Sequence, residues 1–173
     1  MSEQTIAPNK LQRSLMRLDE APAFMRGFVQ NIILRRAVPF TGTAGVQFVS
    51  LAPERVEVRL ANEHRVHNHI AGVHASAMNL LAETATGMVV GMNVRDDCTP
   101  LAKEFSMAFK KRATGGLKAV ATLSAEQRAT MQASDKGEIQ VTVTVTDDAG
   151  VEPVECVFTW VWIPASSSRP TKN

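Results

Sequence analysis

Apolar residues recur at helical spacing over residues 74–91, near the middle of the chain. One side of this run carries Ala77, Leu80, Leu81, Thr84, Ala85 and Met88. Apolar residues also cover much of the opposite side, and a helix that is apolar all round is a buried helix. A single carboxylate, Glu83, stands in the middle of the run. An ionised carboxylate in a dry interior is costly unless it is paired. Glu83 is therefore either a structural residue that caps a loop or pairs across a dimer, or a catalytic base that lines a pocket.

Alternating apolar and polar positions predict strands on both sides of this helix. The predicted strands cover residues 45–51, 56–60, 104–110, 117–124, 139–146 and 154–162. A capping-box sequence from Ser124 to Gln127 predicts a short helix that ends near Ala133. Only the helix at 74–91 is long and interleaved, so the order does not fit a repeating βαβ protein. It predicts an α+β domain in which a mainly antiparallel sheet wraps around one central helix.

The first part of the chain has a helical pattern over residues 9–36, with Pro22 placed to begin a second helix. Pro39–Gly45 is expected to break the pattern. An amphipathic N-terminal helix is typically a lid packed on something larger. A helix on a membrane surface is the less favoured alternative, because its polar face is not strongly basic. We divide the chain into an N-terminal helical extension, a main domain and a disordered Ser-, Pro- and Lys-rich tail, at residues 1–40, 41–164 and 165–173.

Composition narrows the class of protein. The 173 residues carry a formal charge of +2, which is too small to argue for a nucleic-acid partner. Cys98 and Cys156 are far apart, so two free thiols in a reducing compartment are expected, although one disulfide is an open alternative. We see no signal peptide, and no run approaches the roughly 18 apolar residues of a membrane span. A soluble cytoplasmic protein without a membrane partner is therefore expected.

Four histidines, His64, His67, His69 and His74, fall within eleven residues and raise the question of a metal site. Glu63 is the nearest carboxylate, and an extended loop would point the rings in different directions. Solvated imidazoles are therefore favoured over a metal. No phosphate-binding glycine loop and no nucleophile-elbow sequence is present, so we expect no metal and no cofactor.

The junction at residues 74–76, where the polar loop meets the helix, can also carry chemistry. Free backbone amides at a helix N-terminus polarise a carbonyl or hold an anion. Glu83 lies nine residues beyond His74, about 13 Å along the axis, so one chain's junction cannot act directly with its own Glu83. A two-fold dimer could bring the two together. Lys110–Arg112 is either a solvated strand end or a contact for the phosphates of a coenzyme.

The spacing of Asn68, His74 and Glu83 resembles the signature of hotdog-fold thioesterases of the phenylacetic-acid-degradation type, and most closely their DUF4442 branch. In that signature an Asn is followed six residues later by a His and two small residues, and nine residues after the His by an acidic residue. The resemblance covers about residues 40–163. It implies a hotdog fold, an antiparallel sheet wrapped around one helix, and homodimers that pair their sheets edge to edge and can form dimers of dimers.

The resemblance also implies an acyl-CoA-like thioester as substrate. Glu83 would then be the general base or nucleophile, while His74 and Asn68 orient the carbonyl or the attacking water. The Ala75 amide would polarise the thioester carbonyl across the dimer interface, with Ser76 beside it.

This chain departs from the signature at two places. His74-Ala75-Ser76 stands where His-Gly-Gly is usual. Ala75 still offers an amide, but its methyl group restricts how closely a ligand can approach it. Ala71 occupies the usual position of a small residue three before the His, and the substrate-binding glycine is displaced to Gly72. The geometry of this loop therefore cannot be taken over from the family.

Together these features favour hydrolysis of a small or medium acyl-CoA. The alternative is a non-catalytic hotdog protein that binds an acyl ligand or serves as a structural dimer. A hotdog dehydratase ranks lower, because the His and acidic residue it needs on a different motif are not found.

Overall fold

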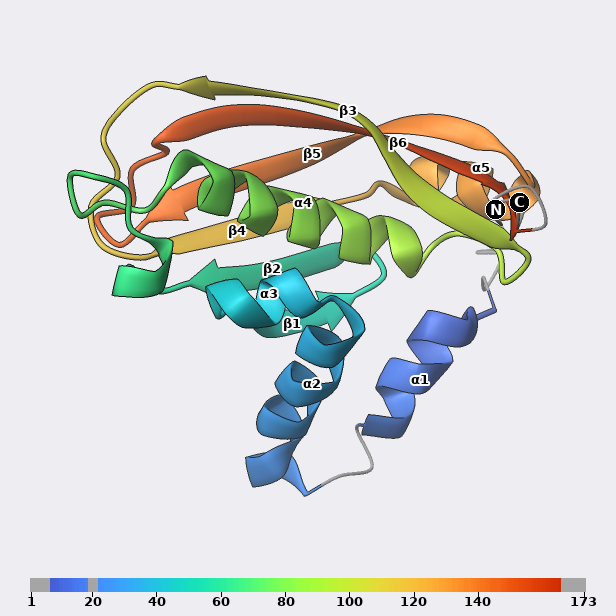
Figure 1. The fold of residues 1–173 in the computed structure, drawn as a ribbon. Coiled ribbons are helices and arrows are strands. Elements are labelled where there is room, and N and C mark those ends of the chain that lie inside the picture. The colour runs from blue at the N-terminus through green and yellow to red at the C-terminus, as the bar shows by residue number, and fades with distance from the viewer. Residues whose placement is uncertain (1–6, 19–21, 166–173) are drawn as a thin grey trace, which may run out of the picture.

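The computed structural model of the chain describes residues 7–18 and 22–165. In this part, a six-stranded antiparallel sheet curls around helix α4 (Ala75–Gly91) in the order β1-β2-β4-β5-β6-β3 (Figure 1). The strands are β1 (Gln47–Ala52), β2 (Arg55–Leu60), β3 (Cys98–Phe109), β4 (Leu117–Thr122), β5 (Gly137–Asp147) and β6 (Val154–Pro164). This is the α+β arrangement that the sequence pattern predicts, with β1 and β3 as the sheet edges.

Helix α4 is buried on every side but one. Leu81, Ala82, Ala85, Val89 and Val90 are fully buried against the rest of the domain. The incompletely buried residues recur every three to four positions and so share one side of the helix. They are Ala75, Ser76, Asn79, Glu83, Thr84, Gly87, Met88 and Gly91, and we call them the open stripe. The carboxylate in the apolar run lies on this stripe rather than within the packed core.

Close packing fixes α4 against β6. A Cβ atom at Gly87 would lie 2.8 Å from the Trp160 ring, so the approach requires glycine there. The indole Nε1–H of Trp160 donates to the Thr86 hydroxyl (3.1 Å), which in turn donates to the Ala82 carbonyl (3.0 Å). Buried polar groups are thereby paired within an otherwise apolar contact.

Three helices precede the sheet: α1 (Lys10–Leu18), α2 (Ala23–Ala37) and α3 (Pro39–Ala44). The expected break at Pro39–Gly45 is wrong, because these residues form α3. Pro39 occupies the first turn, where its missing N–H is not needed, and Gly45 ends the helix with φ of +80°. Proline and glycine here begin and end a helix. The predicted boundary at residue 40 falls inside it.

Helices α1 and α2 extend away from the sheet on the side of β1 (Figure 1). The C-terminal half of α2 is anchored, since Leu34 is buried and the Asn31 side chain pairs with both the N–H and the C=O of Phe48 on β1, at 2.9 and 3.1 Å. Several apolar side chains of α2 are partly or largely exposed: Phe24, Met25, Phe28, Ile32 and Ile33. The start of α1 is anchored as well, because the Asn9 amide donates to the carbonyls of Gly91 and Val94 at 2.9 and 2.7 Å, so the N-terminal helices are held at both ends and exposed between them.

Strand β3 begins at Cys98, six residues before the predicted start at Glu104. Pro100 disrupts the alternating pattern there, but β3 pairs with β6 alone, and proline is tolerated in an edge strand. The short helix α5 (Ala125–Ala133) forms with the predicted capping box of Ser124 and Gln127. The tail from residue 166 lies outside the described residues.

Both cysteines are free and buried. Burial raises the pKa of the Cys156 thiol to about 11. None of the helices in the described ranges is long and apolar enough to cross a membrane.

We expect Thr86→Val to lower the free energy of unfolding by about 1–3 kcal/mol, because the Trp160 Nε1–H would stay buried without an acceptor. Urea denaturation measures the loss. Thr84→Val is the matched control: its half-buried hydroxyl bonds only to Leu80 of its own helix, so we expect a change within about 0.5 kcal/mol. Equal losses in the two variants would contradict the role given to the Thr86–Trp160 pair.

Candidate active site

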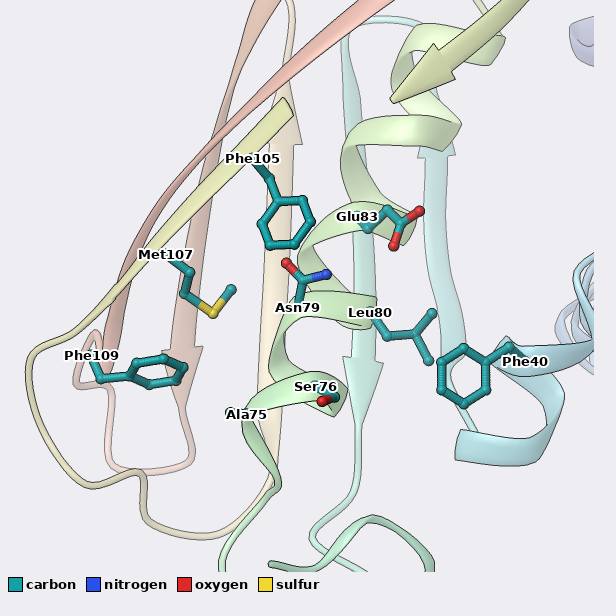
Figure 2. A pocket seen from close by; sticks show the side chains of 9 residues that line it. All are labelled: Phe40, Ala75, Ser76, Asn79, Leu80, Glu83, Phe105, Met107 and Phe109. Atoms are coloured by element: carbon teal, nitrogen blue, oxygen red, sulfur yellow. The ribbon is translucent and has the colours of Figure 1, made fainter. Parts of the chain in front are cut away.

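A cavity of about 410 Å³ lies between β3 and the open stripe of α4 (Figure 2). Strand β3 contributes every second residue, so these side chains share the face that is turned toward α4. Helix α3 contributes one aromatic ring. The lining residues are Phe40, Ala75, Ser76, Asn79, Leu80, Glu83, Phe105, Met107 and Phe109. The cavity therefore runs along α4 from its first turn to Glu83.

Glu83 is half-buried, and burial raises the pKa of its carboxyl above the ordinary value of 4.5. In the described part of the chain no cation and no hydrogen-bond donor contacts its carboxylate. Its side chain lines the 410 Å³ cavity on one side and a second, apolar cavity of about 280 Å³ on the other. Within the described part of one chain, Glu83 therefore lines a cavity and neither caps a loop nor forms an ion pair.

Asn79 lies four residues before Glu83, and its amide points into the same cavity (Figure 2). Its Oδ1 atom is buried without a donor among the residues described. An unpaired buried carbonyl is costly, and this one lines a cavity beside the carboxylate. Sequence reasoning missed Asn79, although its spacing from Glu83 places both on one helix face.

The start of α4 leaves one backbone donor free. His74 is the N-cap, and its Nδ1 accepts from the Ser76 N–H at 3.0 Å. The His74 carbonyl accepts from the N–H groups of Ala77 and Met78. The Ala75 N–H has no acceptor within residues 7–18 and 22–165. Of the first amides of this helix, Ala75 is thus the one available to a ligand.

The predicted site residues do not all share one cavity. Ala75, Ser76 and Glu83 line the 410 Å³ cavity together. His74 lines a neighbouring cavity of about 220 Å³ that shares Phe40, Ser76 and Leu80 with the first. Its ring is occupied in capping the helix. The direct contact between His74 and Glu83 that a single catalytic cluster would need is not formed within one chain.

Asn68 and Gly72 lie in a third cavity of about 250 Å³. The Asn68 Oδ1 atom accepts from the N–H groups of Ile70 and Gly72, each at 3.0 Å, so its side chain closes the loop. These two bonds occupy the Asn68 acceptor, whereas a carbonyl would be oriented by the Nδ2 donor, so the role of Asn68 in orienting a carbonyl or the attacking water stays a prediction.

The third cavity adjoins the first and is basic. Ala75 and Phe109 line both, and Lys111 and Arg112 line the third. Arg112 also donates to the Ile70 carbonyl at 3.2 Å. These two cations therefore lie beside the first turn of α4.

The remaining histidines do not gather into a set of metal ligands with other described residues. The rings of His64 and His67 are 5.9 Å apart, and the His67 Nε2 atom is buried without a partner in the described part of the chain. No group of three or more His, Cys, Asp or Glu residues among those described could hold a metal ion.

A family model described as a domain of unknown function, DUF4442, matches residues 28–163. No curated protein matches the chain. A Pseudomonas aeruginosa protein of unknown function has a similar structure, with a TM-score of 0.71 at 22% identity over 79% of this chain and 94% of that chain.

Two further structures are similar. A Haemophilus influenzae thioesterase has a TM-score of 0.60 at 13% identity, over 72% of this chain and 82% of that chain. A Silicibacter pomeroyi thioesterase family protein has a TM-score of 0.60 at 18% identity, over 80% of this chain and 100% of that chain. At these identities the likeness establishes the hotdog fold.

Ala71 has a φ of +56°, and it is the one non-glycine residue with positive φ in the described ranges. We expect Ala71→Gly to stabilise the protein by about 0.5–1 kcal/mol. Relief of the left-handed strain, about 1–2 kcal/mol, exceeds the entropy cost of glycine, about 0.4–1 kcal/mol. Thermal or urea unfolding tests this. Ala61→Gly, at an exposed position with ordinary φ, should instead lose about 0.4–1 kcal/mol. A loss in both variants would show that Ala71 is not strained.

Proposed function

We propose that this chain, which belongs to the DUF4442 family, hydrolyses acyl-CoA thioesters at Glu83. One observation carries this proposal. The Glu83 carboxylate is half-buried and has no ion-pair partner among the described residues. It lies between a larger cavity that is lined partly by polar groups and a smaller, apolar cavity. Raised carboxyl pKa values in a cavity are typical of general bases that work near neutral pH.

In the proposed reaction the Glu83 carboxylate takes a proton from water. The resulting hydroxide attacks the thioester carbonyl carbon, and the carbonyl oxygen becomes an oxyanion. When this intermediate collapses, the C–S bond breaks, the acid product forms, and the thiolate of the coenzyme leaves and takes up a proton. The buried, unpaired amide oxygen of Asn79 is placed to hold the water beside Glu83. The alternative in which Glu83 attacks the carbonyl directly uses the same residues.

The oxyanion needs a donor, and the free Ala75 N–H is suited to it. Ala75 lies eight residues before Glu83, about 12 Å along the helix, so the two cannot meet at one carbonyl within one chain. We therefore propose a homodimer in which the Ala75 N–H of one copy serves the Glu83 of the other. Strand β3 supports this, because it is an unpaired edge with exposed Leu101, Phe105 and Phe109.

The basic third cavity supports coenzyme A as the thiol carrier. Lys111 and Arg112 adjoin the Glu83 cavity through Ala75 and Phe109. Clustered cations bind phosphates, and a coenzyme lying along this path would place its phosphates there and its thioester near Glu83.

We expect Glu83→Gln to lower kcat/KM for acyl-CoA substrates by about 100-fold or more, because the amide cannot accept a proton. A panel of acyl-CoA chain lengths, with release of free thiol as the readout, measures this. In the wild type, kcat/KM should fall as pH falls through the raised pKa of Glu83, at a higher pH than an exposed carboxyl would give.

Glu54→Gln, at an exposed carboxylate in the turn between β1 and β2, is the control and should leave the rate unchanged.

Because burial raises the pKa of Glu83, the wild type loses stability as pH rises through that pKa, and the Glu83→Gln variant does not. The variant should therefore gain stability relative to wild type as pH rises from about 4.5 through the raised pKa of Glu83, with no further gain above it. A relative loss would mean that Glu83 is a paired structural residue. Binding of acyl-CoA without turnover at any length by folded wild type would favour the non-catalytic alternative.

Replacing Lys111 and Arg112 together by glutamine is expected to raise KM for acyl-CoA by about tenfold, since charged contacts to phosphate are lost. With an acyl-N-acetylcysteamine substrate, which has no phosphates, the same variant should match wild type. Lys136→Gln removes an exposed cation next to Gly137, at the far end of the sheet from Phe109, and serves as the control. An equal loss on both substrates would contradict a phosphate contact.

A further inference from the structure

The apolar cavity on the other side of Glu83 is built by the N-terminal helices and α4 together. Its volume is about 280 Å³. Leu34 and Val38 come from α2 and its end, Thr41 from α3, and Thr84, Gly87 and Met88 from the open stripe. Phe48 of β1 and Trp160 of β6 complete the wall, with Leu80 and Glu83 at the side shared with the 410 Å³ cavity. We call this space the inner chamber.

Polar groups in the inner chamber are already engaged, apart from Glu83. The Thr41 hydroxyl donates to the Val38 carbonyl at 2.7 Å, and the Thr84 hydroxyl donates to the Leu80 carbonyl at 2.6 Å. The Trp160 indole N–H is bonded to Thr86. The walls therefore offer a ligand apolar contacts only, with a carboxylate at one side. An apolar chain with its polar head beside Glu83 matches that distribution.

Size favours a chain of medium length. An apolar cavity of about 150 Å³ holds one benzene, so by the same measure this chamber holds about eleven carbon atoms. Leu80 and Glu83 line both cavities, so a thioester carbonyl beside Glu83 would direct its hydrocarbon chain into the chamber. The coenzyme would extend the opposite way, toward Lys111 and Arg112.

From this geometry we infer that the inner chamber binds the acyl chain, and that helices α2 and α3 set its length at about eight to twelve carbons. The inference rests on the proposed function for its choice of an acyl thioester. It assigns the N-terminal helices a role in substrate selection, because without Leu34, Val38 and Thr41 the chamber would lack one wall. The anchoring of α2 through Asn31 and Phe48 holds that wall in place.

The test uses S-alkyl-coenzyme A thioethers, which lack the carbonyl and cannot be hydrolysed. Isothermal titration calorimetry on the full chain gives Kd for alkyl chains of 2 to about 14 carbons. For wild type, we expect Kd to fall about fourfold for each added methylene and to level off near ten to twelve carbons, when the chamber is full. A Kd that does not depend on chain length would overturn the inference.

Val38→Trp fills the chamber from its rim without disturbing the core, because the Val38 side chain is 50% exposed. It should weaken binding of the ten-carbon thioether by at least about tenfold, the effect of two unburied methylenes, and leave the two-carbon thioether unchanged. Val49→Trp is the matched control, because Val49 is 49% exposed and lines none of the cavities described above. Met88→Trp fills the same space from α4 and should act as Val38→Trp does.

The outcomes separate this inference from the proposed function. In one outcome, Val38→Trp and Met88→Trp shorten the alkyl chain length at which Kd levels off, but the wild type hydrolyses no acyl-CoA. This would support the chamber and refute the hydrolase. Hydrolysis of acyl-CoA with equal ten-carbon binding in Val38→Trp and Val49→Trp would support the hydrolase and refute the chamber.

Discussion

The structure depends on the burial of a helix that has almost no polar side. Residues of α4 on all sides but one must be removed from water, and a single flat sheet cannot do this, so the sheet curls around the helix. The open stripe is what this packing leaves uncovered. Polar side chains of α4 either lie on it, as Ser76, Asn79 and Glu83 do, or find a partner inside, as Thr86 does with Trp160. A ligand can therefore contact α4 only along this stripe.

Half-burial suits Glu83 to chemistry better than full burial would. A fully buried, unpaired carboxylate would be strongly biased toward its neutral form, and a fully exposed one would keep an ordinary pKa. At the boundary between the 410 Å³ cavity and the inner chamber, burial raises the pKa while water can still reach the group from one side. Glu83 thus lies between polar and apolar surroundings, which the thioester group and the acyl chain of a substrate would respectively need.

Much of the fold could be predicted because its signals are local. Periodicity predicted α4 and five of the strands to within about three residues at each end, and the capping box predicted α5. The errors also have local causes. Proline and glycine predict a break at residues 39–45, but Pro39 begins α3 and Gly45 ends it, and Pro100 obscures the first half of β3. The inner chamber could not be predicted, because Leu34, Thr84 and Trp160 meet only after folding. Asn79 could have been found from its four-residue spacing to Glu83, whereas the loop-closing bonds of Asn68 needed coordinates.

The two sides of Glu83 differ in what builds them. On one side the chain itself supplies the walls of the inner chamber, from α2, α3, α4, β1 and β6. On the other side the free Ala75 N–H lies too far along α4 to serve the same carbonyl, and the β3 residues Phe105 and Phe109 are 54% and 57% exposed. In the proposed dimer a second copy would cover that side and bring its own Ala75 amide. Recognition of the acyl chain would then belong to each subunit, while polarisation of the thioester would belong to the pair. A separated subunit would thus keep its preference for chain length but lose its turnover.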